Sequence, residues 1–219
     1  MDPTDRRADR PALEAVVFDL GGVLVDWDPR HLYRSLFPLD TEVETFLRQV
    51  CSPAWNAELD RGRPFADAVA ELAGRHPDLA GPIEAYWTEW EQMVAGPLPG
   101  MVELLGDLAV AGIRRYLLTN SSAETVPRAA RAYPFLGELD GWLVSGEVGL
   151  LKPDPAMFEL LVRRFDLRRT ATLLVDDLPA NVEGAGAAGL EAVLFTGAGP
   201  LRRHLLALGV DLSPRGSNE

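Results

Sequence analysis

The sequence predicts an α/β fold, a doubly wound parallel (Rossmann-like) sheet with a small helical domain inserted after the first strand. After residue 98, short apolar runs alternate with helical patterns, which is typical of parallel sheets covered by helices. Between residues 30 and 95 only helical patterns occur. A chain of 219 residues is long enough for one such domain with an insert, but not for two full-size domains.

The strands are predicted from continuous apolar runs, which indicate strands buried on both faces. The first run, LEAVVFDL (13–20), is followed by Gly21 and Gly22. Three more runs and a candidate fifth have the same character: RRYLLTN (114–120), ATLLVDD (171–177), EAVLFTG (191–197) and the candidate GWLVSGE (141–147).

Four segments after the insert have apolar residues at helical spacing, namely 101–112, 122–133, 154–165 and 178–189. Asp154 is the predicted N-cap of the third, because an aspartate followed by proline is typical of a helix start. The fourth contains Gly184, Gly186 and Gly189 at the spacing G-x-G-x-x-G. In a dinucleotide site such glycines directly follow a strand, which these do not, so we interpret them as helix packing.

The inserted segment carries helical patterns at 31–37, 41–50, 65–76 and 83–94, and PLPG (97–100) is the predicted hinge back to the sheet. The expected division of the chain follows from these patterns. Residues 13–29 and 96–210 form the α/β core domain, residues 30–95 form the helical domain, and residues 1–12 and 211–219 are loose tails.

Charge and composition exclude several classes of partner. The 21 basic and 33 acidic residues give a net charge of −12, so we expect no binding of nucleic acid or of an anionic membrane. No apolar run approaches the roughly 18 residues of a membrane span, and the N-terminus lacks the apolar core of a secretory signal. The single Cys51 cannot form an internal disulfide. We therefore expect a cytoplasmic protein.

Three of the predicted strands end in polar residues. They are Asp19, the pair Thr119-Asn120 and the pair Asp176-Asp177. Because ligands bind at the carboxyl ends of the strands in an open α/β sheet, we expect these side chains to converge. Two adjacent carboxylates repel each other, and a cation is the simplest group that would hold them together.

Position 152 carries the only lysine among the 21 basic residues, in the sequence GLLKPDP. Taken in order, FDLGGVLVDWD, LLTNS, LKPDP and LVDDLPAN resemble the four motifs of the haloacid dehalogenase-like (HAD) hydrolase superfamily. The resemblance extends over residues 14–197, and the helical insert stands where that superfamily carries its type 1 cap. It implies a phosphatase-type, Mg²⁺-dependent hydrolase of a small phosphorylated metabolite.

The resemblance also implies roles for individual residues. Asp19 would attack phosphorus and form an aspartyl-phosphate. Lys152 would neutralise Asp19 and a phosphoryl oxygen, Thr119 would donate its hydroxyl to the phosphoryl group, and Asn120 would shape that corner of the site.

The implied metal ligands form a second set. Mg²⁺ would lie between the Asp19 carboxylate, the backbone carbonyl of Gly21 and Asp177. Asp176 would support these ligands or act as an alternate one.

One position departs from the phosphatase pattern. Phosphatases of the superfamily usually carry a second aspartate two residues after the nucleophile, as general acid and base, and this chain has Gly21 there. A water molecule or Asp26 would then supply the proton. Dehalogenases also lack the second aspartate, so a 2-haloacid dehalogenase is an alternative, and a non-catalytic binder of phosphorylated ligands is another. The pair Asp176-Asp177 favours the phosphatase.

Substrate recognition is expected from the insert and its hinge. Arg61 and Arg63 flank Gly62 between two helical segments, and in cap-bearing relatives a glycine-containing turn at this place points at the active site. Trp27 lies at the hinge into the insert. These three side chains are the predicted substrate-binding residues.

Overall fold

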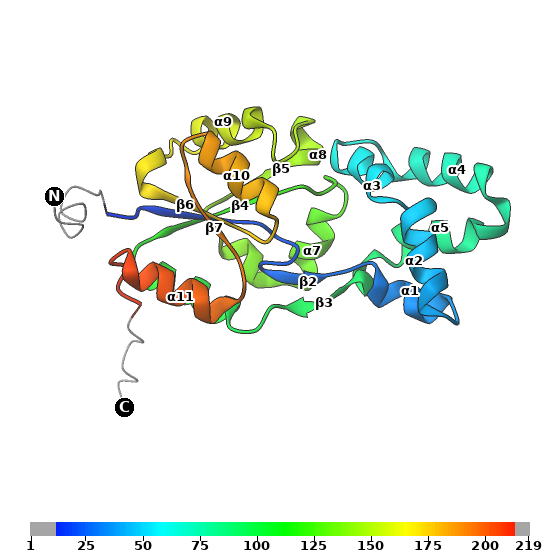
Figure 1. Cartoon of the computed structure of the whole chain (residues 1–219), viewed down its shortest axis with the longest axis horizontal. Helices are drawn as coiled ribbons and strands as arrows, with labels where there is room; N and C mark the ends of the chain where they lie inside the picture. Colours follow the sequence, from blue (N-terminus) through cyan, green and yellow to red (C-terminus); the bar gives the residue numbers. More distant parts are fainter. Residues whose placement is uncertain (1–11, 213–219) are drawn as a thin grey trace.

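The computed structural model describes residues 12–212, and a parallel five-stranded sheet forms its centre (Figure 1). The strand order is β5-β4-β1-β6-β7. The predicted α/β class and the candidate fifth strand are therefore confirmed. The strands are β1 (Ala15–Phe18), β4 (Arg114–Thr119), β5 (Gly141–Val144), β6 (Thr172–Asp176) and β7 (Glu191–Leu194).

Strand β1 lies in the middle of the sheet, with β4 on one side and β6 on the other. Phe18 at its end is in register with Leu117 of β4 and Val175 of β6. The chain builds β4 and β5 on one side of β1 and then returns to build β6 and β7 on the other. The direction of winding therefore reverses at β1, and this reversal opens a crevice at the carboxyl ends of the strands.

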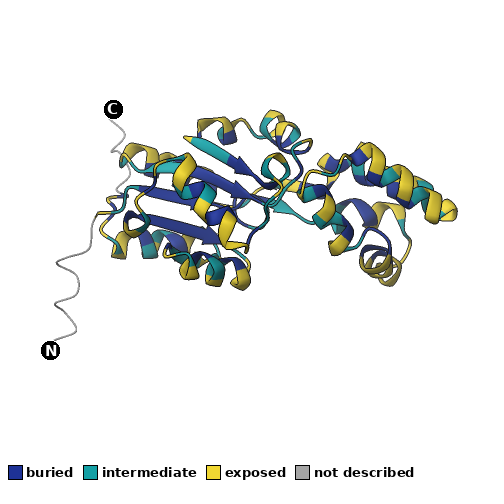
Figure 2. Ribbon diagram, turned by 90° about the horizontal axis from the view of Figure 1, so that it is seen from above, coloured by how far each residue is buried: buried dark blue, intermediate teal, exposed yellow. Residues whose placement is uncertain are grey.

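Helices cover both faces of the sheet (Figure 2). Because side chains alternate along a strand, Val16 and Phe18 of β1 belong to one apolar cluster and Ala15 and Val17 to another. The first cluster includes α6 (Met101–Val110), α7 (Val126–Ala132) and α11 (Ala198–Ala207). The second includes α9 (Pro155–Arg164) and α10 (Pro179–Ala187), while α8 (Ser145–Val148) follows β5.

The ends of the core helices follow from local chemistry. Asp154 is the N-cap of α9, as predicted, and its carboxylate accepts a hydrogen bond of 2.9 Å from the backbone N–H of Ala156. In α10, a Cβ added at Gly184 would lie 2.9 Å from Pro153, so this glycine does serve close packing. The packing interpretation does not extend to Gly186, where an added Cβ would have nothing within 4 Å. Helix α11 was not among the predicted helices.

The insert consists of five helices between β2 (Val25–Trp27) and β3 (Val94–Pro97), which pair antiparallel as its entry and exit. They are α1 (Arg30–Leu36), α2 (Asp40–Gln49), α3 (Pro53–Asp60), α4 (Phe65–Arg75) and α5 (Ala80–Thr88), with short 3₁₀ turns at Pro77–Leu79 and Trp90–Met93. Aromatic rings form much of the interior, and Tyr86 contacts the rings of Tyr33, Trp55 and Phe65.

Sequence patterns identified four helical stretches of the insert but missed α3 and the β2–β3 pair. Helix α3 is short, and its sequence PAWNAELD has no clear apolar stripe. Its start does carry a signal, since Ser52 caps Trp55 and Pro53 occupies the first turn.

The core contacts the insert at three places, two of them through core side chains. The Glu124 carboxylate accepts a 2.9 Å hydrogen bond from the backbone N–H of Phe65 at the start of α4. Arg128 of α7 donates to the Trp87 carbonyl at 2.6 Å, pairs with Glu91, and lies 4.6 Å from the centre of the Trp87 ring. The third contact is between the backbones of the turn after α3 and of α8, described below.

The predicted tails fall almost entirely outside the described residues, which exclude 1–11 and 213–219. Of the residues at the edges, Leu212 is buried against the core. No helix in the described part of the chain has the length and apolar character needed to cross a membrane.

The turn after α3 depends on Gly62. Its φ is +100°, and a Cβ added there would lie 2.7 Å from the carbonyl oxygen of Gly146 in α8. We expect Gly62→Ala to lower the free energy of unfolding by roughly 1–2 kcal/mol, because alanine is strained at positive φ and would also collide with α8. Urea denaturation measures this change.

Gly74 provides the matched control. It lies inside α4 with nothing within 4 Å of an added Cβ, so Gly74→Ala should raise the free energy of unfolding by about 0.5–1 kcal/mol. Equal effects of the two substitutions would contradict the assigned strain at Gly62.

Candidate functional site

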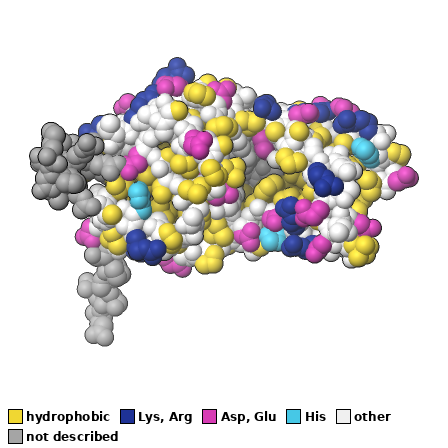
Figure 3. Space-filling model, in the orientation of Figure 1, with side chains coloured by type: hydrophobic (Ala, Val, Ile, Leu, Met, Phe, Trp, Pro, Cys, Tyr) yellow, Lys and Arg dark blue, Asp and Glu magenta, His cyan; other side chains and the backbone are white. Residues whose placement is uncertain are grey.

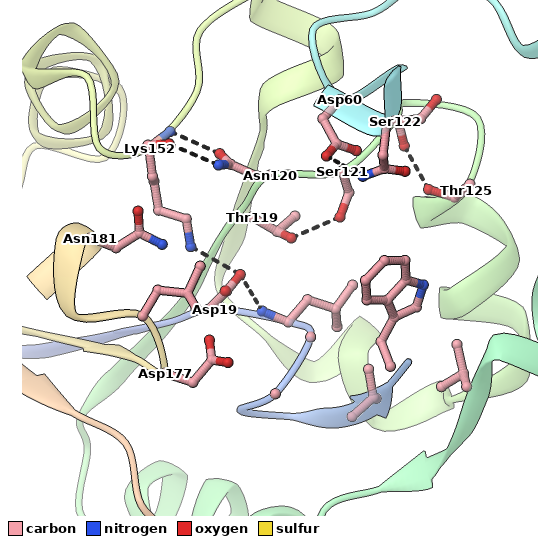
Figure 4. A pocket seen from close by; sticks show the side chains of 18 of the residues that line it. Asp19, Asp60, Thr119, Asn120, Ser121, Ser122, Thr125, Lys152, Asp177 and Asn181 are labelled. Atoms are coloured by element: carbon pink, nitrogen blue, oxygen red, sulfur yellow. Dashed lines mark hydrogen bonds and ion pairs between the residues drawn. The ribbon is translucent and has the colours of Figure 1, made fainter. Parts of the chain in front are cut away.

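A cavity of about 390 Å³ lies at the carboxyl ends of β1, β4 and β6, between the sheet and the insert. In Figure 3 the surface is hollowed between these two parts of the molecule. The core contributes mostly polar side chains (Figure 4): Asp19, Thr119, Asn120, Ser121, Ser122, Thr125, Lys152, Asp177 and Asn181. The insert and its hinge contribute Trp27, Asn56, Asp60, Phe65, Trp90 and Val94.

Asp19 follows β1 directly and is buried at the floor of the cavity. Its Oδ1 accepts hydrogen bonds from the Leu20 backbone N–H at 2.7 Å and lies 3.0 Å from Nζ of Lys152. The described residues provide no hydrogen-bond partner for Oδ2, which leaves that oxygen available to a ligand. Burial raises the pKa of Asp19 to about 6, although the nearby Lys152 ammonium opposes this rise.

Lys152 is fully buried and connects three strands. Its Nζ lies 2.6 Å from Oδ2 of Asp176 and 3.0 Å from Asp19, and it donates to the Leu118 carbonyl at 2.9 Å. Burial alone would lower the pKa of this lysine, but the two carboxylates outweigh burial and hold its pKa above the ordinary value. The side chain is therefore a permanent cation at neutral pH.

Asn120 fixes the backbone around this lysine. Its amide nitrogen donates to the Lys152 carbonyl at 2.9 Å, and its amide oxygen accepts from the Lys152 N–H at 2.8 Å. The residue thus holds the loop before α9 against the end of β4.

The two adjacent aspartates have different surroundings. Asp176 is fully buried, and besides Lys152 it accepts from the Leu178 N–H at 3.0 Å and from Nδ2 of Asn181 at 2.9 Å. Asp177 is half-buried and lines the cavity, and its pKa is raised by burial and by the charge of Asp176. Asp177 is therefore the member of the pair that is free to bind a ligand.

The oxygen atoms at this edge of the sheet suit a divalent cation. Carboxylate oxygens of Asp19, Asp176 and Asp177 lie within 4.8 Å of one another. Gly21 also lines the cavity, and no backbone N–H of the described residues donates to its carbonyl. Carboxylates with a backbone carbonyl form the all-oxygen donor set that Mg²⁺ prefers.

Gly22 allows this close approach. Its φ is +73°, and an added Cβ would lie only 2.4 Å from Oδ2 of Asp177. A side chain at this position would push the Asp177 carboxylate away from the floor of the cavity.

Thr119 and two serines form the corner opposite Lys152. The hydroxyls of Thr119 and Ser121 are 2.8 Å apart, and the Ser121 N–H donates to the Ser145 hydroxyl at 2.8 Å. Sequence analysis identified Thr119 and Asn120 but not Ser121 or Ser122, although LLTNSS places the serines directly after the recognised polar pair. The rule that polar residues at strand ends line the site would have identified both serines if it had been applied to two more residues after β4.

The structure separates the predicted substrate-binding residues. Trp27 lines the cavity, whereas neither Arg61 nor Arg63 is among the residues that line it. Arg63 pairs with Glu58 and Glu71 on the insert, and Arg61 is exposed after the end of α3. Substrate binding by the two arginines stays a prediction that this geometry does not favour.

Asp60 and Asn56 are the polar residues that α3 presents to the cavity, and sequence analysis missed both. Asp26, which it named as a source of protons, does not line the cavity and lies 3.2 Å from Nε2 of His31. The φ of Gly21 is not positive, so the backbone here does not require glycine. A Cβ added at Gly21 would lie 3.4 Å from Cβ of Trp27, which is an ordinary van der Waals contact. The absence of an acid at position 21 is therefore not forced by the backbone.

Comparisons with known proteins agree with this architecture. The chain is 27% identical to the sesquiterpene phosphatase astK of Aspergillus oryzae over 185 residues, which cover 84% of this chain and 90% of that protein. It is also 27% identical to phosphatase MT3486 of Mycobacterium tuberculosis, over 94% of this chain and 99% of that protein.

A solved structure has the same fold. It is a HAD family enzyme of Bacteroides thetaiotaomicron in complex with magnesium and inorganic phosphate, with a TM-score of 0.66 and 18% identity over 84% of this chain and 95% of that one. The sequence model of the haloacid dehalogenase-like hydrolases matches residues 13–189. That match extends over most of the chain and includes the whole cavity floor, so the protein belongs to the haloacid dehalogenase-like hydrolase family.

Proposed function

We propose that this protein is a Mg²⁺-dependent phosphatase that hydrolyses a small phosphorylated metabolite through an aspartyl-phosphate on Asp19. One observation carries the proposal: a buried Asp19 with one unpaired oxygen faces a cavity that also holds a buried Lys152 and a free carboxylate, Asp177. A site for a dianionic phosphoryl group needs both a nucleophile and concentrated positive charge.

In this mechanism, Oδ2 of Asp19 attacks phosphorus while Oδ1 stays bonded to the Leu20 N–H. Holding one oxygen in place leaves the other aimed into the cavity, which contributes to catalysis by orientation. The Lys152 ammonium reduces repulsion between the two anions, and the Thr119 hydroxyl and its Ser121 neighbour are donors for phosphoryl oxygens.

Asp19, Asp177 and the Gly21 carbonyl would hold the metal ion, and Asp176 would support them by fixing Lys152 and the end of β6. A bound Mg²⁺ supplies positive charge for the developing phosphoryl charge and orients the transferred group. The names of the relatives and the magnesium and phosphate of the B. thetaiotaomicron structure support this assignment.

The insert side of the cavity suggests the character of the leaving group. Trp27, Phe65 and Trp90 line that side together with Val94. Rings at this place favour a leaving group that presents an apolar or aromatic surface over a fully hydroxylated one.

A substrate panel tests the proposed function. We expect Mg²⁺-dependent release of inorganic phosphate from esters with apolar or aromatic leaving groups, and loss of activity when the metal is removed by a chelator. Released phosphate is measured for each ester, and released halide is measured for 2-haloacids. Halide release without phosphate release, independent of Mg²⁺, would instead identify a dehalogenase.

A separate prediction concerns the nucleophile, Asp19. We expect Asp19→Asn to reduce phosphate release to the background of the assay, because an amide is a poor nucleophile and cannot form the acyl phosphate. Circular dichroism and the melting temperature check that the variant is folded. Activity within about tenfold of the parent would show that another group attacks phosphorus.

A further prediction concerns Lys152. We expect Lys152→Arg to lower kcat by at least about tenfold although the charge is kept, because a planar guanidinium cannot reproduce the three contacts of one compact ammonium in a closed space. Steady-state kinetics measure the loss. Arg203→Lys is the matched control, because it also replaces one cationic side chain with the other but at a position outside the cavity. This variant should leave kcat unchanged. A rate for Lys152→Arg equal to that of the control would contradict the assigned role.

A further inference from the structure

The insert presents one acidic side chain to the cavity. Asp60 is the last residue of α3 and lines the cavity, and Figure 4 draws its carboxyl above Ser121 and Thr119 in that view. The core places its own carboxylates on the opposite side, at the ends of β1 and β6. A phosphate ester with its phosphorus at Asp19 would therefore have its leaving group on the side of the cavity where Asp60 lies.

Two residues of the insert fix the orientation of this carboxyl. Nδ2 of Asn56 donates to Oδ2 of Asp60 at 2.8 Å, and Oδ1 of Asn56 accepts from the Tyr86 hydroxyl at 2.7 Å. Burial raises the pKa of Tyr86 well above its ordinary value, so this phenol keeps the proton that it donates to Oδ1 of Asn56.

This chain of hydrogen bonds decides which oxygen of Asp60 carries a proton. Because the Tyr86 hydroxyl occupies the amide oxygen of Asn56, Asn56 must present its N–H groups to Asp60. Oδ2 of Asp60 is thus held as an acceptor, and the proton of a neutral carboxyl belongs on Oδ1. No described residue forms a hydrogen bond with Oδ1, so that proton is available to a ligand.

The surroundings of Asp60 favour the neutral carboxyl. Burial, together with the charge of Asp19, raises the pKa of Asp60 to about 7, and the nearby Arg61 partly opposes this rise. Asp19 faces Asp60 from the core, Tyr86 stands behind it on α5 and acts through Asn56, and Arg61 is its neighbour in the chain. No described residue forms an ion pair with Asp60.

We propose that Asp60 is the general acid of the reaction, donating the proton on Oδ1 to the leaving-group oxygen of the phosphate ester. The bond from Oδ2 of Asp19 to phosphorus forms while the ester P–O bond breaks. The electron pair of the broken bond stays on the leaving oxygen, which takes the proton and departs as an alcohol. This proposal rests on the proposed phosphatase function and assigns the role that Gly21 cannot fill.

The second half-reaction follows from the same geometry in reverse. The Asp60 carboxylate left by the first step accepts a proton from the water that attacks the aspartyl-phosphate. That step forms a new P–O bond, breaks the bond to Asp19 and releases inorganic phosphate, and Asp60 returns to its neutral form.

The test compares two esters of similar size. The leaving group of p-nitrophenyl phosphate departs without a proton, whereas that of 2-phenylethyl phosphate is a poor alkoxide that needs one. We expect Asp60→Asn to lower kcat/KM by at least about 100-fold for 2-phenylethyl phosphate and by less than about fivefold for p-nitrophenyl phosphate. Asp60→Glu should recover part of the loss.

Asp78→Asn is the matched control, because Asp78 is an exposed aspartate of the same insert, in the 3₁₀ turn at Pro77–Leu79, and lies outside the cavity. It should change neither rate. Tyr86→Phe frees Asn56 to turn its amide, so this variant should lose rate with 2-phenylethyl phosphate and retain it with p-nitrophenyl phosphate. Melting temperatures of all variants check that the insert is folded.

A pH profile gives a separate readout. A general acid works only when protonated, so the ratio of kcat/KM between the parent and Asp60→Asn should fall as the pH rises through about 7 with 2-phenylethyl phosphate. Because the same substrate is used for both enzymes, the effect of its own ionisation on kcat/KM cancels in this ratio.

The outcomes separate the two proposals. Equal losses on both esters in Asp60→Asn, or a pH-independent ratio, would overturn the general-acid role while parent activity on p-nitrophenyl phosphate still supports the phosphatase. A parent enzyme that releases phosphate from neither ester, with or without Mg²⁺, would overturn the proposed function, and the role of Asp60 with it.

Discussion

The buried ammonium of Lys152 is the interaction on which the rest of the site depends. It lies between Asp19 of the β1 end and Asp176 of the β6 end, and it also donates to the Leu118 carbonyl of β4. A buried charge is costly unless it is paired and hydrogen-bonded, and here all three of its protons have a partner. One side chain thus fixes the relative positions of three strand ends.

The charges around Lys152 explain why a divalent ion suits this edge of the sheet. Three carboxylates, Asp19, Asp176 and Asp177, face one ammonium, which leaves an excess of two negative charges. Burial already pushes the pKa values of Asp19 and Asp177 upward, the expected response to uncompensated charge. An ion with two positive charges balances the cluster without further protonation and leaves the nucleophile ionised.

The sheet and the cavity floor could be predicted because both follow from one rule. Continuous apolar runs mark buried parallel strands, and in a doubly wound sheet the polar residues that end them must meet at one edge. Asp19, Thr119 and Asp177 line the cavity for this reason. The sequence could not predict that Asp176 is bound by neighbouring side chains while Asp177 faces the cavity. That difference depends on which of the two carboxylates Lys152 and Asn181 bind.

The cavity residues of the insert could not be predicted in the same way. No rule comparable to the one for strand ends says which residue of a helix or turn faces a site. Arg61 and Arg63 in the turn after α3 were predicted to bind substrate because of their charge. In the structure Arg63 forms ion pairs within the insert, and it is Asp60 that lines the cavity. Which residue of a turn faces a site depends on the local backbone, here the positive φ of Gly62 and its approach to Gly146. A pattern of apolar residues contains none of this information.

Placing the proton donor on the insert has a consequence for the reaction cycle. In a site whose nucleophile and acid share one loop, the two groups stay together whether the insert is open or closed. Here Asp19 belongs to the core and Asp60 to the insert, and the turn after α3 lies against α8 while Arg128 holds the Trp87 carbonyl. Leaving-group protonation by Asp60 therefore depends on the contacts that hold the insert against the core.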